Sequence, residues 1–510
     1  VRVALRAAGY RFASGHRIRV SVASNYWPVL WPSPFPGELA VHHAGSRLIL
    51  PTIPPRDGSL APDYDRIEAA MLLIAGWMDG YVDPALRMLE RCVYAPRRAI
   101  VGNWVHEYPD DGYPGPNLDW LHELVRFFDH WLKGVDNGTM DEPALTFFRR
   151  DYARPEPFPR TWPGAWRSEP SFPAPGATER SFWLGAGDVA LTGRLQSDPA
   201  APGGVDRFPH RATTGTRTAL SWGAGSPPNG LARDLRFDDA LVPTYTSAAL
   251  TEPIEILGFP MASLTVEASM PIATIVVRLS DVAPDGTAAQ VSAGVLNLTH
   301  RDAHDTPTAL EPGRPYAVRV ALRAAGYRFA PGHRVRVSVA SNYWPVLWPS
   351  PFPGELAIHH AGSRLALPTI PPGDGALAAP TFKTSPAGLE DVGGGSAEPP
   401  VWRILEDVIA GTVTVSTDDA GEGSLPDGTV VFSGEQLEMT ASDADPAHAR
   451  MANAVHYWLD QDGFRIDARA TGETTSTETD FRMVVRLEVD LDGERFFERD
   501  WDETIPRRLV

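Results

Sequence analysis

The chain has 510 residues, of which 43% are hydrophobic and 22% are charged, and these proportions are typical of a folded protein with apolar cores. The formal net charge of −18 argues against nucleic acid as a partner, because such a surface repels phosphate backbones. The single cysteine, Cys92, excludes an intrachain disulfide and a cysteine-based zinc site, and it favours a reducing, cytoplasmic compartment.

The length predicts two to four domains, and the high proline and glycine content favours turns and β-structure over long helices. The longest strongly apolar stretch runs from Ala69 to Met78. It is about half as long as a membrane-spanning helix, so no membrane partner is expected. Because the sequence opens at Val1 within a β-rich pattern, we expect an incomplete N-terminus, at which a signal peptide cannot be assessed.

The first segment, residues 1–61, is a near-identical copy of residues 318–378. Six positions differ between the two copies, and the Arg56/Gly373 pair is the least conservative of them. Two distant, nearly identical copies do not fit a solenoid, which needs three or more units. A recent duplication, a fusion of neighbouring genes and a sequence-assembly artefact all stay open. We expect residues 318–378 to be the copy that is integrated in the β-domain, since a strand from Pro315 and Tyr316 leads into it.

Residues 62–152 mix short apolar runs with helical patterns, which predicts an α/β region. Met71 to Trp77 is an apolar run of strand length, and such a strand belongs in a covered parallel sheet. Asp83-Pro84 signals a helix start, with Asp83 as the cap. Asp79 should therefore lie in the turn at the carboxyl end of a buried strand, where α/β proteins place their active sites.

The next stretch shows the same pattern, in which a short strand is followed by a polar residue and then a helix. Ala99 to Trp104 reads as a second short strand, and His106 follows it directly. An amphipathic helix should come next and end at Gly134. Its predicted apolar face consists of Trp120, Leu121, Leu124, Phe127, Phe128 and Trp131. An Asp and then a His at successive strand ends is the order of the last two members of a Ser-Asp-His triad. From the pattern alone, Asp79 as a turn cap and His106 as an ordinary loop histidine remain an equal alternative.

The remaining segments are read from composition. We predict an irregular Pro-rich connection over residues 153–178, a β-sandwich over 179–380, a linker over 381–398 and a β-rich extension over 399–510. Two strands are expected around the Pro331-Gly332 turn, and a hairpin is expected with Asp492-Gly493 at its turn. The adjacent pairs His42-His43 and His359-His360 point to opposite faces of a strand, which disfavours a shared metal.

Three stretches, "GWMDGYVDPALRM", "VGNWVHEYPDD" and "RFFDHWLKG", resemble the CocE/NonD serine hydrolases, the group of cocaine esterase and X-Pro dipeptidyl-peptidase-like enzymes. The resemblance implies that Asp79 and His106 are the triad Asp and His. Asn103 stands where the family usually has Pro. The resemblance further implies the C-terminal half of an α/β-hydrolase core over residues 62–152, followed by a jelly-roll β-sandwich over residues 179–380.

The family's nucleophilic Ser, in a Gly-x-Ser-x-Gly turn, has no counterpart in these 510 residues. Ser46, Ser226, Ser363 and Ser396 all lack the second glycine. We therefore expect a hydrolase of esters or amides, X-Pro dipeptidyl bonds among them, whose chain as written is inactive. The alternative is a non-catalytic β-sandwich module that carries a hydrolase remnant. A small ester, amide or peptide is the expected substrate, no cofactor or metal is expected, and a homodimer stays open.

Overall fold

The chain divides into two compact units, Val1–Leu60 and Ala61–Val510. The computed structural model describes residues 64, 67–189, 191–199, 203–218, 230–373, 375, 377–379, 381–384 and 401–510. The duplicated segment 1–61 and most of the predicted linker 381–398 lie outside the described residues. Among the described residues, no helix is both long and apolar enough to cross a membrane.

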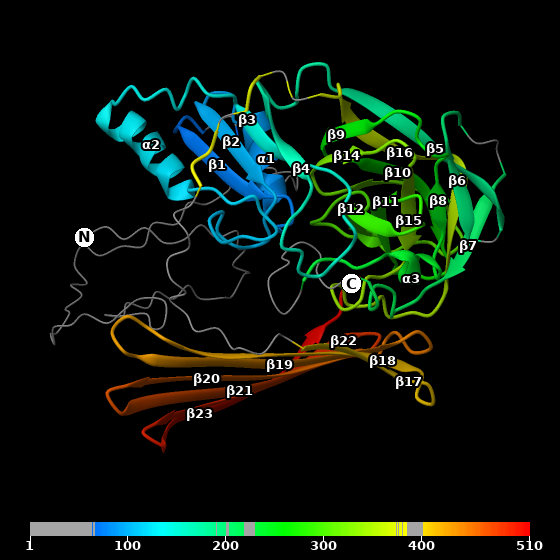
Figure 1. Cartoon of the computed structure of the whole chain (residues 1–510). Helices are drawn as coiled ribbons and strands as arrows, with labels where there is room; N and C mark the ends of the chain where they lie inside the picture. Colours follow the sequence, from blue (N-terminus) through cyan, green and yellow to red (C-terminus); the bar gives the residue numbers. More distant parts are fainter. Residues whose placement is uncertain are drawn as a thin grey trace, which may run out of the picture. The chain divides into compact units, whose positions relative to one another are not determined.

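Three parallel strands form the α/β part of the described chain (Figure 1). They are β1 (Met71–Gly76), β2 (Arg97–Gly102) and β3 (Leu145–Arg150), joined in that order. Helix α1 (Val82–Arg91) connects β1 to β2, and α2 (Trp120–Lys133) connects β2 to β3. The strands predicted from the two apolar runs are thus confirmed as β1 and β2.

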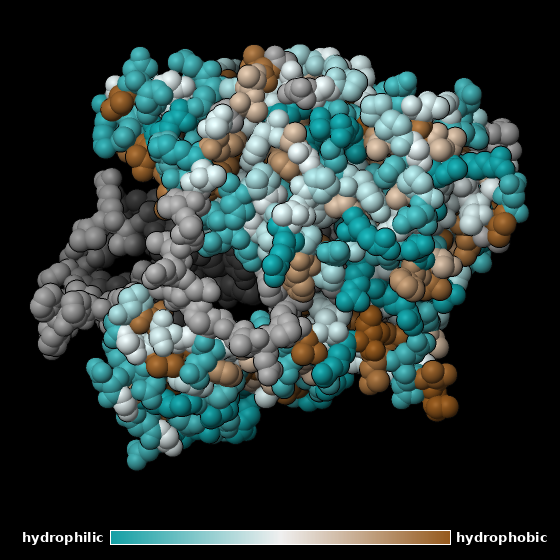
Figure 2. Space-filling model, viewed as in Figure 1, coloured by the Kyte–Doolittle hydropathy of each residue, from teal (hydrophilic) through white to brown (hydrophobic). Residues whose placement is uncertain are grey.

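Two details of the helices differ from the prediction. Tyr81 occupies the cap position of α1, while Asp83 lies in its first turn and accepts a hydrogen bond from the backbone N–H of Ala324. Helix α2 ends at the left-handed Gly134 as predicted. However, half of its predicted apolar face is open: Leu121, Phe128 and Trp131 are 50%, 49% and 40% exposed. Of the predicted face only Phe127 is buried, and the polar Glu123 is buried beside it, where it forms ion pairs with Arg98 and Arg126. Apolar residues are visible on the surface of this region in Figure 2.

The predicted irregular connection 153–178 contains a strand, which corrects that prediction. Strand β4 (Gly164–Glu169) pairs antiparallel with β3 along its whole length. Trp166 of β4 packs edge-on against Phe148 of β3, with 5.7 Å between the ring centroids. Flanking prolines hid this strand in the sequence, since a proline cannot donate a ladder hydrogen bond.

The sheet continues through many further strands. They are β5 (Thr178–Val189), β6 (Thr192–Gln196), β7 (Val205–Pro209), β8 (Thr244–Thr246), β9 (Ile254–Gly258), β10 (Met261–Ala268), β11 (Thr274–Val282), β12 (Ala288–Asn297), β13 (Tyr316–Ala321), β14 (Ala325–Phe329), β15 (Arg334–Ala340) and β16 (Glu355–Ile370). A short helix α3 (Arg236–Asp239) and a 3-10 turn (Leu298–His300) lie between them. In β10, buried residues alternate with partly exposed ones, so one face of the strand lies in the largest hydrophobic core.

The second copy of the duplicated segment forms β14, β15, β16 and, together with residues Tyr316 and Ala317, β13. The turn at Pro331-Gly332 is present, and Gly332 has a φ of 84°. The strands on either side do not pair with each other: β14 pairs with β9 and β3, whereas β15 pairs with β11 and β8. The two strands are therefore predicted correctly, and a local hairpin between them is absent.

The C-terminal residues form a separate antiparallel sheet in which each strand pairs with the next along the chain. Its strands are β17 (Val401–Asp407), β18 (Thr412–Ser424), β19 (Val430–Ser442), β20 (Arg450–Gln461), β21 (Phe464–Ser476), β22 (Asp480–Leu491) and β23 (Glu494–Pro506). The hairpin at Asp492-Gly493 is confirmed, since these residues have φ values of 48° and 82° between β22 and β23.

Candidate active site

Asp79 and His106 lie on neighbouring loops that leave the carboxyl ends of β1 and β2. The two loops run side by side, because the N–H of Trp77 donates to the carbonyl of Gly102 at 2.9 Å and that of Met78 donates to Trp104 at 3.1 Å. The parallel pairing of β1 with β2 thus continues beyond the strand ends. It places the two candidate residues at the same sheet edge.

The Asp79 carboxylate and the His106 ring are in direct contact. Nδ1 of His106 lies 3.2 Å from each carboxylate oxygen of Asp79. The Asp79 side chain is 17% exposed, whereas the His106 side chain is 57% exposed. The backbone N–H of Tyr81 donates to Oδ1 of Asp79 at 3.0 Å, and the Tyr81 ring lies 5.2 Å from the His106 ring. The pairing predicted from the two strand ends is present.

Two small residues allow the loops to approach this closely. A Cβ atom on Gly76 would lie 2.2 Å from the carbonyl oxygen of Trp104, and one on Gly102 would lie 2.3 Å from the Trp104 ring. Neither position accepts a larger residue without moving the loop that carries His106. Trp104 is itself fixed, because its Nε1 donates to the carbonyl of Pro116 at 2.9 Å.

Asn103, which stands where the family usually has Pro, has a structural role in this loop. Its side chain is fully buried and donates from Nδ2 to the carbonyl of Gly115 at 3.2 Å. Glu107 follows His106, and burial raises the pKa of its carboxyl, with Asp111 adding to the effect and a backbone hydrogen bond from Tyr113 opposing it.

The sequence did not reveal a hydrogen bond that reaches the Asp79 loop from a segment distant in the sequence. Nη2 of Arg323, between β13 and β14, donates to the carbonyl oxygen of Asp79. The next residue, Ala324, donates its N–H to Oδ1 of Asp83 at 2.9 Å. Burial lowers the pKa of Arg323, while Asp83 and Asp79 oppose this shift. More than 240 residues separate these partners, so no local pattern could have revealed the contact.

The remaining candidate residues from the sequence are four serines and the paired histidines. Ser363 is buried within β16, where its hydroxyl donates to the carbonyl of His359 at 2.5 Å, which makes it part of a strand rather than a nucleophile. Ser46, Ser226 and Ser396 lie outside the described residues. His359 and His360 contact separate carboxylates, Glu267 at 3.0 Å and Asp206 at 2.8 Å. In the part of the chain that the structure describes, no group of three His, Cys, Asp or Glu side chains is arranged to hold a metal.

Comparison with known proteins finds a matching family and several related sequences. The family described as the X-Pro dipeptidyl-peptidase C-terminal non-catalytic domain matches residues 1–58 and 137–376, which is more than half of the chain. A Mycobacterium bovis protein named as a serine esterase is 30% identical over 342 residues, covering 61% of this chain and 51% of that protein. The cocaine esterase of a Rhodococcus species is 27% identical over 296 residues, covering 54% of this chain and 49% of the esterase.

The chain spans about half the length of these two curated relatives. A Bacillus anthracis protein named as an Xaa-Pro dipeptidyl-peptidase is 23% identical over 243 residues, covering 47% of this chain and 36% of its own length. The matched family segment includes both copies of the duplication, and the names of the relatives agree with the resemblance carried by the Asp79 and His106 stretches. The chain therefore belongs to the CocE/NonD hydrolase family and carries that family's X-Pro dipeptidyl-peptidase C-terminal domain.

Proposed function

We propose that this chain supplies the Asp and the His of a Ser–His–Asp triad that hydrolyses an ester or amide bond. The observation that carries the proposal is the contact between Nδ1 of His106 and the carboxylate of Asp79, at 3.2 Å to each oxygen. Such a contact fixes the ring orientation and the tautomer of the histidine and stabilises the imidazolium that forms during the reaction.

The proposed role of each residue follows from its position. His106 acts through Nε2, the ring nitrogen that does not face Asp79, as the general base toward a serine hydroxyl and then as the acid toward the leaving group. Asp79 stays ionised and orients the ring. Arg323 and the N–H of Tyr81 are positioning groups, because they hold Asp79 and do not reach the reacting atoms.

The proposed architecture has a partial α/β-hydrolase core over residues 62–152 and a jelly-roll sandwich over residues 179–380. The parallel order β1-β2-β3 with its connecting helices supports the first assignment. The match of the C-terminal non-catalytic domain supports the second. The proposed substrates are small esters, amides or peptides, since relatives are named as esterases and as dipeptidyl-peptidases.

The nucleophile is the component that this sequence does not supply. No Gly-x-Ser-x-Gly turn occurs in the 510 residues. A triad without its serine loses several orders of magnitude in rate. We therefore propose that the 510-residue chain alone has no turnover and does not react with a fluorophosphonate.

The experiment compares the 510-residue chain with a chimera. In the chimera, the part of the mycobacterial relative that the 510-residue chain does not cover is fused in front of residues 61–510 of this chain. We expect fluorophosphonate labelling and esterase activity in the chimera only. In the chimera, His106→Ala should abolish activity, whereas His448→Ala should not. His448 is a matched control, because it is an exposed histidine that contacts Asp445 at 2.8 Å. Labelling of the 510-residue chain that depends on His106 would contradict the proposed absence of a nucleophile.

A second candidate function is a non-catalytic binding or structural module. It is favoured by one observation, that the domain matched over more than half of the chain is described as non-catalytic. A chimera that folds, with His106 contacting Asp79, but neither labels nor turns over would support this second candidate.

A further inference from the structure

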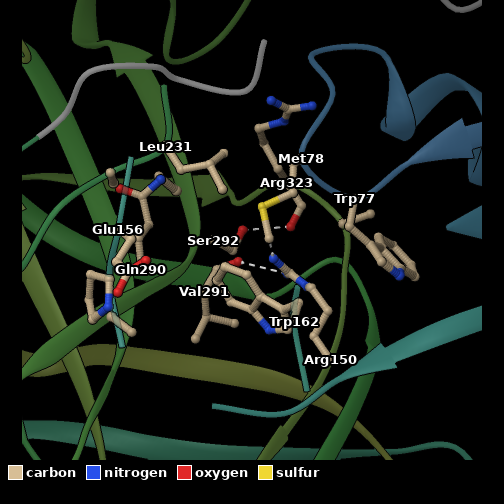
Figure 3. A pocket seen from close by; sticks show the side chains of 15 residues that line it. Trp77, Met78, Arg150, Glu156, Trp162, Leu231, Gln290, Val291, Ser292 and Arg323 are labelled. Atoms are coloured by element: carbon tan, nitrogen blue, oxygen red, sulfur yellow. Dashed lines mark hydrogen bonds between the residues drawn. The ribbon is translucent and has the colours of Figure 1, made fainter. Parts of the chain in front are cut away.

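A small pocket lies beside the Asp79 loop, and His106 is not among the residues that line it. Its walls come from the loop after β1, the end of β3 and the strand β12 (Figure 3). Apolar residues form part of the walls: Trp77, Met78, Trp162, Leu231 and Val291. The polar residues Gln290 and Ser292 also line it, as does Arg323, which donates to the carbonyl oxygen of Asp79.

Arg150, the last residue of β3, brings a positive charge into this pocket. Its residue surface is 3% exposed. Nη2 donates to the carbonyl of Val291 at 3.2 Å, and Nη1 lies 3.9 Å from the sulfur of Met78. The guanidinium also lies 5.7 Å from the centre of the Tyr327 ring. Nε has no hydrogen-bond partner, and within the described part of the chain no carboxylate comes within ion-pair distance of Arg150.

Other buried arginines in the described chain are neutralised. Arg98 pairs with Glu142 at 2.5 Å, Arg167 with Glu255 at 2.6 Å and Arg278 with Asp239 at 2.9 Å. Arg507 donates to the backbone carbonyls of Thr477 and Pro349 and to a terminal carboxylate oxygen of Val510. Arg150 has one carbonyl and a weak thioether contact, and it is therefore the buried cation with the least compensation.

A buried guanidinium without a counter-charge is energetically unfavourable, and a bound anion would offset that cost. Burial lowers the pKa of Arg150 to about 10, which still leaves the side chain protonated at neutral pH. The pocket is therefore lined by a fixed positive charge that lacks a carboxylate partner, although Nε of Arg150 is itself buried from solvent.

From this geometry we propose that the pocket binds a small organic monocarboxylate. The carboxylate pairs with the guanidinium of Arg150, and a short branched apolar chain lies against Trp162 and Leu231. Two observations favour a monoanion over phosphate. Apolar side chains share the walls with the polar ones, and the Glu156 side chain, which also lines the pocket, would repel a second negative charge. Neither Asp79 nor His106 lines the pocket, so the proposal does not require a working triad, although Arg323 lines the pocket and also holds Asp79.

The first test titrates the intact wild-type chain by calorimetry with 3-methylbutanoate, its neutral amide and inorganic phosphate at constant ionic strength. We expect the carboxylate to bind about tenfold or more tightly than the amide, as charge-assisted hydrogen bonds are worth about 1.5–3 kcal/mol. Phosphate should bind more weakly than the carboxylate. Equal affinity for carboxylate and amide, or tighter binding of phosphate, would overturn the proposal without any variant.

The second test uses variants of the same chain. Arg150→Met should lose the preference for the carboxylate, whereas Arg154→Met should keep it. Arg154 is the matched control, because its side chain is 73% exposed and lies outside the pocket. Glu156→Gln, at an exposed residue and so not expected to disturb folding, should tighten carboxylate binding by removing repulsion. Retention of the preference in Arg150→Met, or unchanged or weaker binding in Glu156→Gln, would place the anion elsewhere.

Discussion

Four charged side chains form a cluster between α2 and β2, and two of them, Arg98 and Glu123, are buried. Arg98 lies 3.3 Å from Glu123 and 2.5 Å from Glu142, and Arg126 contacts both carboxylates. These contacts raise the pKa of Arg126 although burial opposes the shift. Each charge in such a group depends on its partners, because removal of one leaves another insufficiently compensated.

Glu123→Gln should therefore destabilise the protein by about 2 kcal/mol, since it leaves the buried guanidinium of Arg98 and the partly buried one of Arg126 sharing one carboxylate. Urea unfolding of the variant and the wild type measures the difference. Glu90→Gln, at an exposed position of α1, is the control and should change stability little. A loss in Glu123→Gln no larger than in the control would show that the group does not contribute to stability.

His210 predicts a pH dependence of stability. The residue is 5% exposed, and burial lowers the pKa of its ring from 6.5 to about 4; Arg507 adds to this effect, while Ser350 and Asp443 oppose it. The unfolded state takes up the proton first as the pH falls. The contribution of the neutral ring to stability is therefore complete above pH 6.5 and is lost progressively down to about pH 4, to a total of about 3 kcal/mol.

The measurement is the free energy of unfolding between pH 7 and pH 4 for the wild type and for His210→Gln. The variant should be less sensitive to acid over this range. His448→Gln, at an exposed histidine, should follow the wild type. Parallel curves for the wild type and His210→Gln would contradict the role given to His210.

For single residues, the sequence predicts only those contacts that follow from a local pattern of neighbouring residues. Asp79 and His106 each follow an apolar strand, so their proximity could be inferred. Arg150 could not be singled out, because the sequence Leu145–Arg150 ends in two arginines that read as a solvated strand end, yet both are buried. Arg323 and Asp79 meet only through the tertiary fold.

At the scale of elements, the segment between β13 and β14 holds the loop between β1 and α1. Arg323 and Ala324 each contribute one hydrogen bond to it, at Asp79 and Asp83. A segment of the β-rich region thus sets the position of the carboxylate that orients His106.

Arg323→Met should loosen this loop while keeping much of the side-chain volume. We expect faster amide exchange over residues 77–83 and a loss of stability of about 1–2 kcal/mol, as for a removed buried hydrogen bond to a charged donor. Arg319→Met, at an exposed position of β13, is the control. Unchanged exchange over residues 77–83 would show that the loop holds its shape without Arg323.

The elements themselves were predictable where hydrophobic patterns matched their surroundings. The apolar runs of β1 and β2, the two strands around Pro331-Gly332 and the Asp492-Gly493 hairpin follow from such patterns. Helix α2 shows the limit: the pattern predicts the helix and its end, but Phe128 and Trp131 of its aromatic stripe are exposed while Glu123 is buried. Periodicity reports which residues are apolar, whereas the partners of a helix decide which face is covered.

At the scale of the whole molecule, residues 61–510 form one compact unit, and strands β13 to β16, which contain the second copy of the repeat, are paired within it. The first copy carries the same strand sequences and cannot take the same places. Deletion of residues 1–61 should therefore leave the thermal unfolding transition nearly unchanged or improve solubility. Calorimetric scans of the full and shortened chains provide the test, and a collapse of the transition would show that the first copy is the structural one.

The pairing order of the α/β strands has one more consequence. Within the described residues, β1 ends that order and bonds only to β2, so one side of its backbone has no neighbouring strand. A parallel sheet extends readily at such an edge. Within the described part of the chain, the backbone groups on that side of β1 thus remain available for hydrogen bonds to an added strand, on the same strand whose carboxyl end leads to Asp79.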